Sequence, residues 1–297
     1  MQSDLTTAAE NHAAVTVIYP VEEYGEDRGN ASALAEQGAR IIWEVDNGET
    51  PPPSPLPSGE STVSAQLPIH AKFALVDGVA YVDGHNFFSS DVLLRDANAA
   101  DYAAIQTDLT SFPPSPPSVS TTAFTTDKYD SLDAEAALIG NANAGAGSTV
   151  DFISEDFDDY GTPAEAVYGA LRAAAQHGAT VNVIVEGPAS DFDDYETCDL
   201  NTLSASGAHV YLGSGGSEKI TLIGPSGGTP TSAWIGSSNM SDYDFIDWGM
   251  TVTDAPVIAA MQSYYATALA NASSYSASPP NSCTLIRGRG AQRPPRG

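Results

Sequence analysis

The sequence predicts an α/β fold made of two similar lobes. Short apolar runs suit buried strands, helical segments separate them, and the same order of segments occurs twice along the 297 residues. Because strands that alternate with helices form parallel crossover units, each lobe is expected to hold a mainly parallel mixed sheet flanked by helices. The second lobe opens with a helix and a strand that the first lacks, so the N-terminal lobe is expected to be truncated.

The elements are expected in the same order in both lobes. The first lobe runs strand, helix, strand, hairpin, strand and helix, over residues 15–21, 31–38, 39–45, 69–87, 91–96 and 97–109. The second opens with its extra helix and strand and then runs helix, strand, helix, strand, hairpin, strand and helix, over residues 135–144, 149–157, 164–179, 181–187, 200–207, 209–213, 216–241, 247–254 and 255–269. Each hairpin pairs two apolar strands and ends in a turn rich in Gly and Asn.

Changes in composition divide the chain into four parts. They are a first lobe over residues 1–112, a Pro-rich linker over 113–134, a second lobe over 135–275 and a Pro/Gly/Arg-rich tail over 276–297. The first lobe begins in what corresponds to the end of the 164–179 helix, which indicates that N-terminal sequence, with any signal peptide, has been lost. In that case a secreted or extracytoplasmic location is favoured.

The charge balance disfavours nucleic acid as a partner. There are 11 Lys plus Arg against 38 Asp plus Glu, a formal charge of −27, and such a surface repels DNA and RNA. No run approaches the ~20 apolar residues of a membrane-spanning helix. Cys198 and Cys283 would form one disulfide only in an oxidising compartment, which the sequence leaves open. We expect a monomer.

A group of residues suited to phosphate chemistry lies in the first hairpin. His70, Lys72 and Asp77 have the spacing H-x-K-x4-D, and six residues separate Asp77 from Gly84, His85 and Asn86. On a strand, residues i and i+2 share a face, so His70 and Lys72 are expected to point towards one small site. An imidazole beside an ammonium group suits binding and attack at a phosphate.

The second hairpin repeats part of this group. Ser217 and Lys219 share a face of the equivalent strand. The turn that follows contains four further candidate residues, Gly236, Ser237, Ser238 and Asn239. The chain has only three lysines, and two of them occupy these matched positions. The matched lysines therefore indicate a shared function.

The double occurrence of H-x-K-x4-D-x6-G-S-x-N resembles the phospholipase D superfamily, over about residues 8–270. The resemblance implies two lobes whose motifs converge at their interface, and phosphodiester chemistry with no metal and no cofactor. In such chemistry one histidine attacks phosphorus while the other protonates the leaving oxygen. The second histidine then activates water or an alcohol against the phosphohistidine.

The resemblance also implies a role for each matched residue. His70 is the expected nucleophile, Lys72 and Lys219 bind the phosphate oxygens, and Asn86 and Asn239 add amide donors. A carboxylate after the turn holds the second imidazole nitrogen in this family, which indicates Asp91 for His70 and Asp247 in the second half. The alternative for both is an Asp that binds local backbone at a strand start. We expect Asp77 to brace the hairpin.

Three departures from the family pattern limit the activity. Ser217 stands where histidine is expected, Gly224 replaces the aspartate, and Gly84-His85-Asn86 is one residue short. A serine hydroxyl is no proton donor near neutral pH, and loss of a general acid typically costs ~10² to 10⁴ in rate. Ser217 is then an inactivating substitution, a mark of a weak or inactive natural enzyme, or compensated by another residue. His209 is the nearest histidine in sequence, although a strand position suits it better.

Three functions follow from this reading. The first is a phosphodiester hydrolase or phosphatidyltransferase, with a phospholipid headgroup or a small phosphodiester as substrate. The second is a nuclease of the same superfamily, which the acidic composition disfavours. The third is a catalytically silent module that binds phosphate or another protein, which Ser217 makes plausible.

Overall fold

The computed structural model describes residues 2–45, 49–64, 70–84, 92–110, 124–125, 128–141, 145–157, 162–190, 192–213, 218–240 and 247–277. Contacts divide the chain into two compact units. The first unit comprises residues 1–70, 103–117 and 244–246, and the second comprises 71–102, 118–243 and 247–297. The hairpin that follows His70 therefore groups with the second half of the chain, not with the strands that precede it.

The first unit contains a parallel sheet of order β1-β2-β3. Its elements in order are α1 (Gln2–Glu10), β1 (Thr16–Pro20), η1 (Val21–Glu23), α2 (Tyr24–Glu36), β2 (Arg40–Val45) and β3 (Glu60–Ser64), and α3 (Ala99–Thr110) crosses from the second unit into the first. Trp43 is fully buried in its core, stacks on Tyr19 and donates from its indole to Glu60 at 2.9 Å. The Trp43 contact thus ties β2 to the edge strand β3.

A small antiparallel sheet opens the second unit. It has the order β4-β5-β6, formed by β4 (Lys72–Val76), β5 (Val79–Asp83) and β6 (Leu93–Asp96). Asp77 and Gly78 form the two-residue turn between β4 and β5, with φ angles of 50° and 80°. Asp and Gly tolerate this left-handed conformation best, which explains the tight hairpin.

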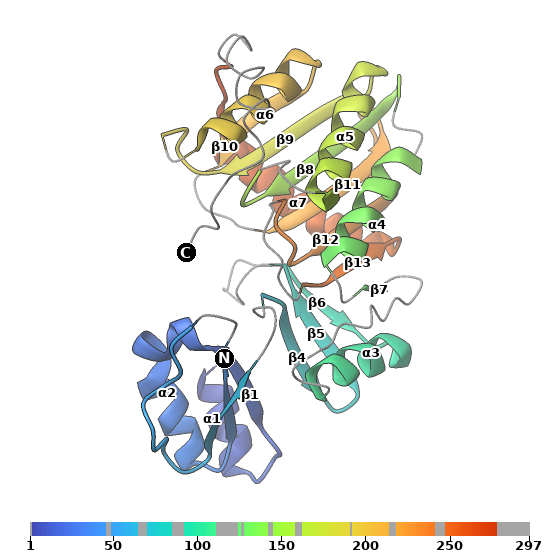
Figure 1. The fold of residues 1–297 in the computed structure, drawn as a ribbon. Coiled ribbons are helices and arrows are strands. Elements are labelled where there is room, and N and C mark those ends of the chain that lie inside the picture. The colour runs from blue at the N-terminus through green and yellow to red at the C-terminus, as the bar shows by residue number, and fades with distance from the viewer. Residues whose placement is uncertain are drawn as a thin grey trace. The chain divides into compact units, whose positions relative to one another are not determined.

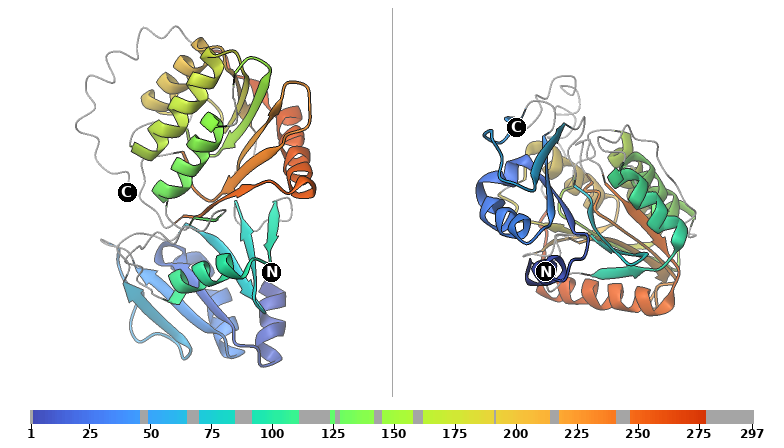
Figure 2. Two further views of the ribbon diagram at one scale, coloured as in Figure 1. Left: turned by 90° about the vertical axis from the view of Figure 1, so that its right-hand side faces the viewer. Right: turned by 90° about the horizontal axis from the view of Figure 1, so that it is seen from below.

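The rest of the second unit is an eight-stranded mixed sheet covered by helices on both faces (Figures 1 and 2). Its order is β14-β10-β9-β8-β11-β12-β13-β7. The elements in chain order are β7 (Phe124–Thr125), α4 (Lys128–Asn141), β8 (Ser148–Ser154), α5 (Thr162–Gln176), β9 (Thr180–Glu186), α6 (Asp194–Ala205), β10 (His209–Gly213), β11 (Lys219–Pro225), β12 (Ser232–Gly236), β13 (Gly249–Val252), α7 (Ala255–Asn271) and β14 (Ser273–Ser274). The α/β class is confirmed, and among the described strands parallel pairing occurs within β1–β3 and β8–β10. The eight-stranded sheet is not mainly parallel as expected, because β11, β12, β13, β7 and β14 all join it through antiparallel pairs.

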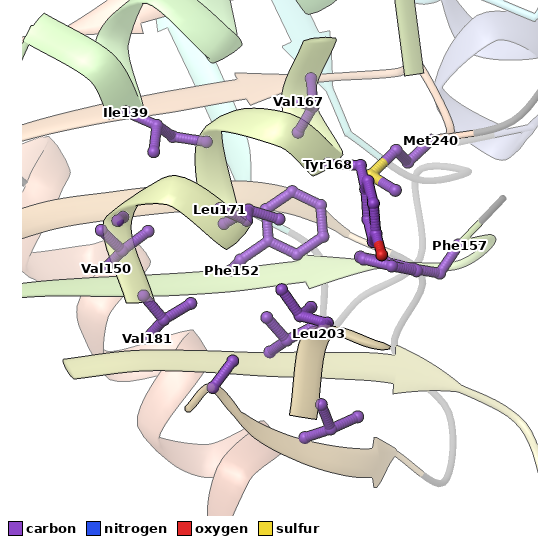
Figure 3. Close-up of a cluster of buried hydrophobic side chains, with 14 of the residues drawn as sticks. Ile139, Val150, Phe152, Phe157, Val167, Tyr168, Leu171, Val181, Leu203 and Met240 are labelled. Carbon is purple, nitrogen blue, oxygen red and sulfur yellow. The ribbon is translucent and has the colours of Figure 1, made fainter. Parts of the chain in front are cut away.

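The main core lies between this sheet and helices α4, α5 and α6 (Figure 3). Val150 and Phe152 of β8 alternate with residues that face the other side, and they pack against Leu171 of α5. Phe157 lies just beyond β8 with ring-centroid distances of 6.0 Å to Phe152 and 6.1 Å to Tyr168. Buried aromatic rings before and after residues 155 and 156 therefore fix the end of β8.

The two halves of the chain differ at one strand. In the second half, β8 pairs with both β9 and β11. In the first half, the equivalent strands β1 and β4 belong to separate sheets, and no described residue pairs with both. This arrangement agrees with the extra strand that the sequence assigns to the second half alone.

Two further observations bear on the sequence predictions. Cys198 on α6 is disulfide-bonded, and Cys283 lies outside the described residues. Within the described ranges, every helix is too short or too polar to cross a lipid bilayer.

Candidate active site

The two matched lysines lie near each other in the second unit. Each is the first residue of its strand, with Lys72 opposite Asp83 on β5 and Lys219 opposite Gly236 on β12. Burial and the positive charge of Lys219 lower the pKa of Lys72 from 10.5 to about 7, against the opposing pull of nearby carboxylates. The carboxylates are those of Asp247, Glu155 and Asp83. Lys72 can therefore bind an anion as an ammonium or exchange a proton near neutral pH.

Lys219 is almost fully buried and forms an ion pair with Glu155. The Lys219 Nζ to Glu155 Oε2 distance is 2.8 Å, with side-chain exposures of 3% and 40%. Glu155 follows the last residue of β8, a strand that runs antiparallel to β11. The exposed Glu155 carboxylate thus reaches the buried Lys219 ammonium from the solvent side.

Asn239 is held in the same way by the next residue, Asp156. The Asn239 Nδ2 donates to Asp156 Oδ2 at 3.2 Å, and the Asn239 Oδ1 is buried without a hydrogen-bond partner among the described residues. Phe157 forms an isolated bridge with Met240, which fixes Asp156 beside Asn239. Two consecutive carboxylates therefore occupy the amide and ammonium donors that the sequence assigns to phosphate.

Ser237, just after β12, is hydrogen-bonded to Trp248, just before β13. The Ser237 backbone N–H donates to Trp248 O at 3.0 Å, and the Trp248 N–H donates to Ser237 Oγ at 3.0 Å. The Ser237 hydroxyl in turn donates to Asp247 Oδ1 at 2.7 Å, and Ser238 Oγ donates to Ser131 of α4 at 3.0 Å. Asp247 therefore braces this turn while its charge also acts on Lys72.

The two lysine-bearing hairpins meet at their glycine turns. A Cβ atom on Gly84 would collide with the Glu218 carboxylate and lie 3.1 Å from Gly236 O. The Trp248 indole Nε1 donates to Asp83 O at 3.3 Å. Only glycine permits this approach, which brings the strand end opposite Lys72 against the strand end opposite Lys219.

A buried acid, Glu135 of α4, bonds to Thr221, which lies on β11 two residues from Lys219 and on the same face. Thr221 Oγ1 donates to Glu135 Oε1 on α4 at 2.5 Å, and Glu135 is fully shielded from solvent. Burial raises the pKa of Glu135 from 4.5 to about 8, although the Thr221 bond opposes the rise. Glu135 is therefore a neutral acid at neutral pH. Glu135 could not be singled out from the sequence, because a single Glu on a helix has no distinguishing pattern.

Two candidate residues lie away from the lysine pair. Asp77 occupies the exposed hairpin turn, five residues along β4 from Lys72, which is about 16 Å. His209 lies level with Leu222 of β11 but three strands away, so its Cα lies about 17 Å from that of Lys219. Asp77 thus shapes the hairpin, and His209 is too distant to replace the missing acid beside Lys219.

The structure describes only some of the remaining candidate site residues. His70 is partly buried and lies two residues before the start of β4, at the end of the first segment of the first unit. Four predicted site residues, His85, Asn86, Asp91 and Ser217, lie outside the described residues. Within the described part of the chain, no group of three or more His, Cys, Asp or Glu side chains is arranged to hold a metal ion.

Comparison with known proteins identifies the fold. No protein-family model and no curated protein sequence matches the chain. Polyphosphate kinase from Porphyromonas gingivalis is similar over 98% of this chain, with a TM-score of 0.60 and 15% identity. This chain spans about half, 53%, of that kinase. Phosphatidylserine synthase from Haemophilus influenzae is similar over 97% of this chain and 90% of its own, with a TM-score of 0.57 and 8% identity.

Proposed function

We propose that this chain, whose fold is that of the phospholipase D superfamily, is a metal-independent phosphodiester hydrolase or phosphatidyltransferase. The observation that carries the proposal is the pair Lys72 and Lys219. They begin equivalent strands of two hairpins that meet, and the charge of one lowers the pKa of the other. In a chain with three lysines and a charge of −27, two close ammonium groups mark a site for an anion.

In the proposed reaction, His70 acts as the nucleophile. A nitrogen of its ring forms a bond to phosphorus, the bond from phosphorus to the leaving oxygen breaks, and that oxygen takes up a proton from solvent water. Water or an alcohol then attacks the phosphohistidine, the bond from nitrogen to phosphorus breaks, and the attacking oxygen loses its proton to solvent water. Lys72 and Lys219 balance the negative charge that gathers on the non-bridging oxygens.

The charges around the lysines favour a substrate with a single phosphodiester. Four carboxylates, those of Asp83, Glu155, Asp156 and Asp247, lie close to the lysines or to Asn239. A polyanion would meet repulsion from these groups, whereas one phosphodiester places a single negative charge between two ammonium groups. A lipid headgroup or a small phosphodiester therefore fits better than DNA or RNA.

A second candidate function is a phosphate-binding module without turnover. Ser217 replaces the expected second histidine, and Glu155 and Asp156 already occupy Lys219 and Asn239. An anion would have to displace these carboxylates, and no described histidine near Lys219 replaces the proton donor. The two functions differ in whether any bond to phosphorus is broken.

The test is turnover of bis(p-nitrophenyl) phosphate, phosphatidylcholine vesicles and single-stranded DNA, each with EDTA present. We expect slow release from the first two substrates, loss of activity in His70→Ala and faster release in Ser217→His. His209→Ala is the matched control and keeps wild-type activity, because His209 lies far from Lys219. Phosphate binding without turnover in both wild type and Ser217→His would favour the module, and cleavage of DNA alone would favour a nuclease.

A further inference from the structure

Glu218, the residue between Ser217 and Lys219, reaches from the second hairpin to the first. Its side chain is fully buried. The Val92 backbone N–H, just before β6, donates to Glu218 Oε1 at 2.5 Å. The Glu218 Oε2 lies against Gly84, where a Cβ atom would collide with it. Gly84 and Val92 are the residues on either side of segment 85–91, which carries Asn86 and Asp91.

In the second hairpin, the corresponding hydrogen bonds form within the hairpin itself. There, Ser237 and Trp248 bond to each other through backbone groups and the Ser237 hydroxyl. His85 stands at the position that corresponds to Ser237, and the first turn is one residue shorter. In the first hairpin, the acceptor for the Val92 N–H is Glu218, which belongs to the other hairpin.

The contact runs in one direction only. The residue of the first motif that corresponds to Glu218 is Ala71, which has no polar side chain to reach the second hairpin. Gly84 follows Asp83, the residue opposite Lys72, and Glu218 precedes Lys219. The Glu218 carboxylate thus lies where the strand ends of both lysines meet.

We propose that Glu218 is a positioning residue that holds the two lysine-bearing hairpins together through its contacts at Gly84 and Val92. Glu218 belongs to the second motif, which has Ser217 in place of a histidine, and it fixes the position of the first motif. A buried carboxylate is costly without hydrogen bonds, and the Val92 N–H provides one of them. The link from this brace to catalysis rests on the proposed function, while the brace itself does not.

The test compares Glu218→Ala with Glu218→Gln, which keeps an acceptor oxygen but loses the charge. We measure hydrogen exchange of the Val92 amide, and kcat and KM for bis(p-nitrophenyl) phosphate. Glu218→Ala is expected to speed Val92 exchange by about tenfold to a hundredfold, the range for loss of a hydrogen bond to a charged group. It is expected to lower kcat more than it changes KM, and Glu218→Gln to restore both readouts.

Glu196→Ala is the matched control, since it also removes a buried carboxylate that accepts a backbone N–H, from Asp193 at 3.1 Å on α6. It should leave Val92 exchange unchanged. If Glu218→Ala does not fold, Glu218→Asp shortens the side chain and should also speed Val92 exchange. Unchanged exchange in the variant that folds, or faster exchange with wild-type kcat, overturns the proposal. Absence of turnover in the wild type would overturn the proposed function, while Val92 exchange still decides whether Glu218 holds the hairpins.

Discussion

Substitution of Lys219 by Met should raise the pKa of Lys72. The pKa of Lys72 is lowered from 10.5 to about 7, first by burial and next by the charge of Lys219. At an effective dielectric constant of about 20, removal of one neighbouring like charge is worth about 1 to 3 kcal/mol, or about one to two pH units of titration. Met keeps the length of the side chain but removes the repulsion, and the Glu155 carboxylate then loses its ion-pair partner.

The assay is acetylation of Lys72 at a series of pH values, followed by mass spectrometry of its peptide. Only the neutral amine reacts, so the rate against pH gives the pKa of this lysine without any need for turnover. We expect a midpoint near 7 in the wild type. In Lys219→Met we expect a midpoint about one to two pH units higher, still below that of free lysine because burial remains. A wild-type midpoint near 10, or no rise in the variant, would refute the claim that the two lysines interact.

Three further predictions concern residues around the lysines. The pKa of Glu135 is about 8 in the folded protein, against its ordinary value of 4.5, so the free energy of unfolding should fall as the pH rises between these values, by at most about 1.4 kcal/mol per pH unit. Urea titrations should show a smaller fall in Glu135→Gln. An unchanged pH dependence in that variant would contradict a neutral Glu135. Glu155→Gln should strengthen inorganic phosphate binding several-fold in calorimetry by releasing Lys219, whereas weaker binding would mean that Glu155 assists the anion. Gly84→Ala should lower stability by about 1–3 kcal/mol through overpacking, while Gly25→Ala, where a Cβ meets no atom within 4 Å, should not lower it.

The parts of the fold that could be predicted are those with a clear hydrophobic period. Strand β9 and helix α7 lie within two residues of the expected 181–187 and 255–269, because buried apolar runs and a Pro near the helix start mark them. Strand β3 was not expected, since its sequence ESTVS is polar and follows a proline-rich stretch. It forms because it pairs with β2 and its first residue, Glu60, accepts from the Trp43 indole.

Two helices begin earlier than expected, and a local capping signal explains the start of one of them. Helix α6 was expected from residue 200 but begins at Asp194. Asp193 caps it by accepting from the backbone N–H groups of Tyr195 and Glu196, and Glu196 accepts from Asp193 N–H in return. This capping box is visible in the sequence as an Asp followed three residues later by Glu. Helix α2 also begins earlier than expected, at Tyr24, despite the low helix propensity of Gly25 and Gly29.

The candidate site could be predicted only where a spacing marks it. The matched positions of Lys72 and Lys219 follow from the repeated motif, and the structure brings these lysines together. Glu135, Glu155 and Glu218 were missed because each acts through a contact with a residue distant in the sequence. One signal was available for Glu155: it belongs to a pair of acids directly after a buried strand, whose carboxyl end is a usual place for polar site residues.

The most direct test of the proposed reaction is to trap the phosphorylated enzyme. Wild-type protein is mixed with a radiolabelled phosphodiester in the presence of EDTA and quenched in alkali, in which phosphohistidine survives, and the labelled peptide is then sequenced. We predict label on the peptide that contains His70, its loss in acid and its absence in His70→Ala. Turnover of the same substrate with no trapped label, or with label on a different residue, would contradict a phosphohistidine at His70.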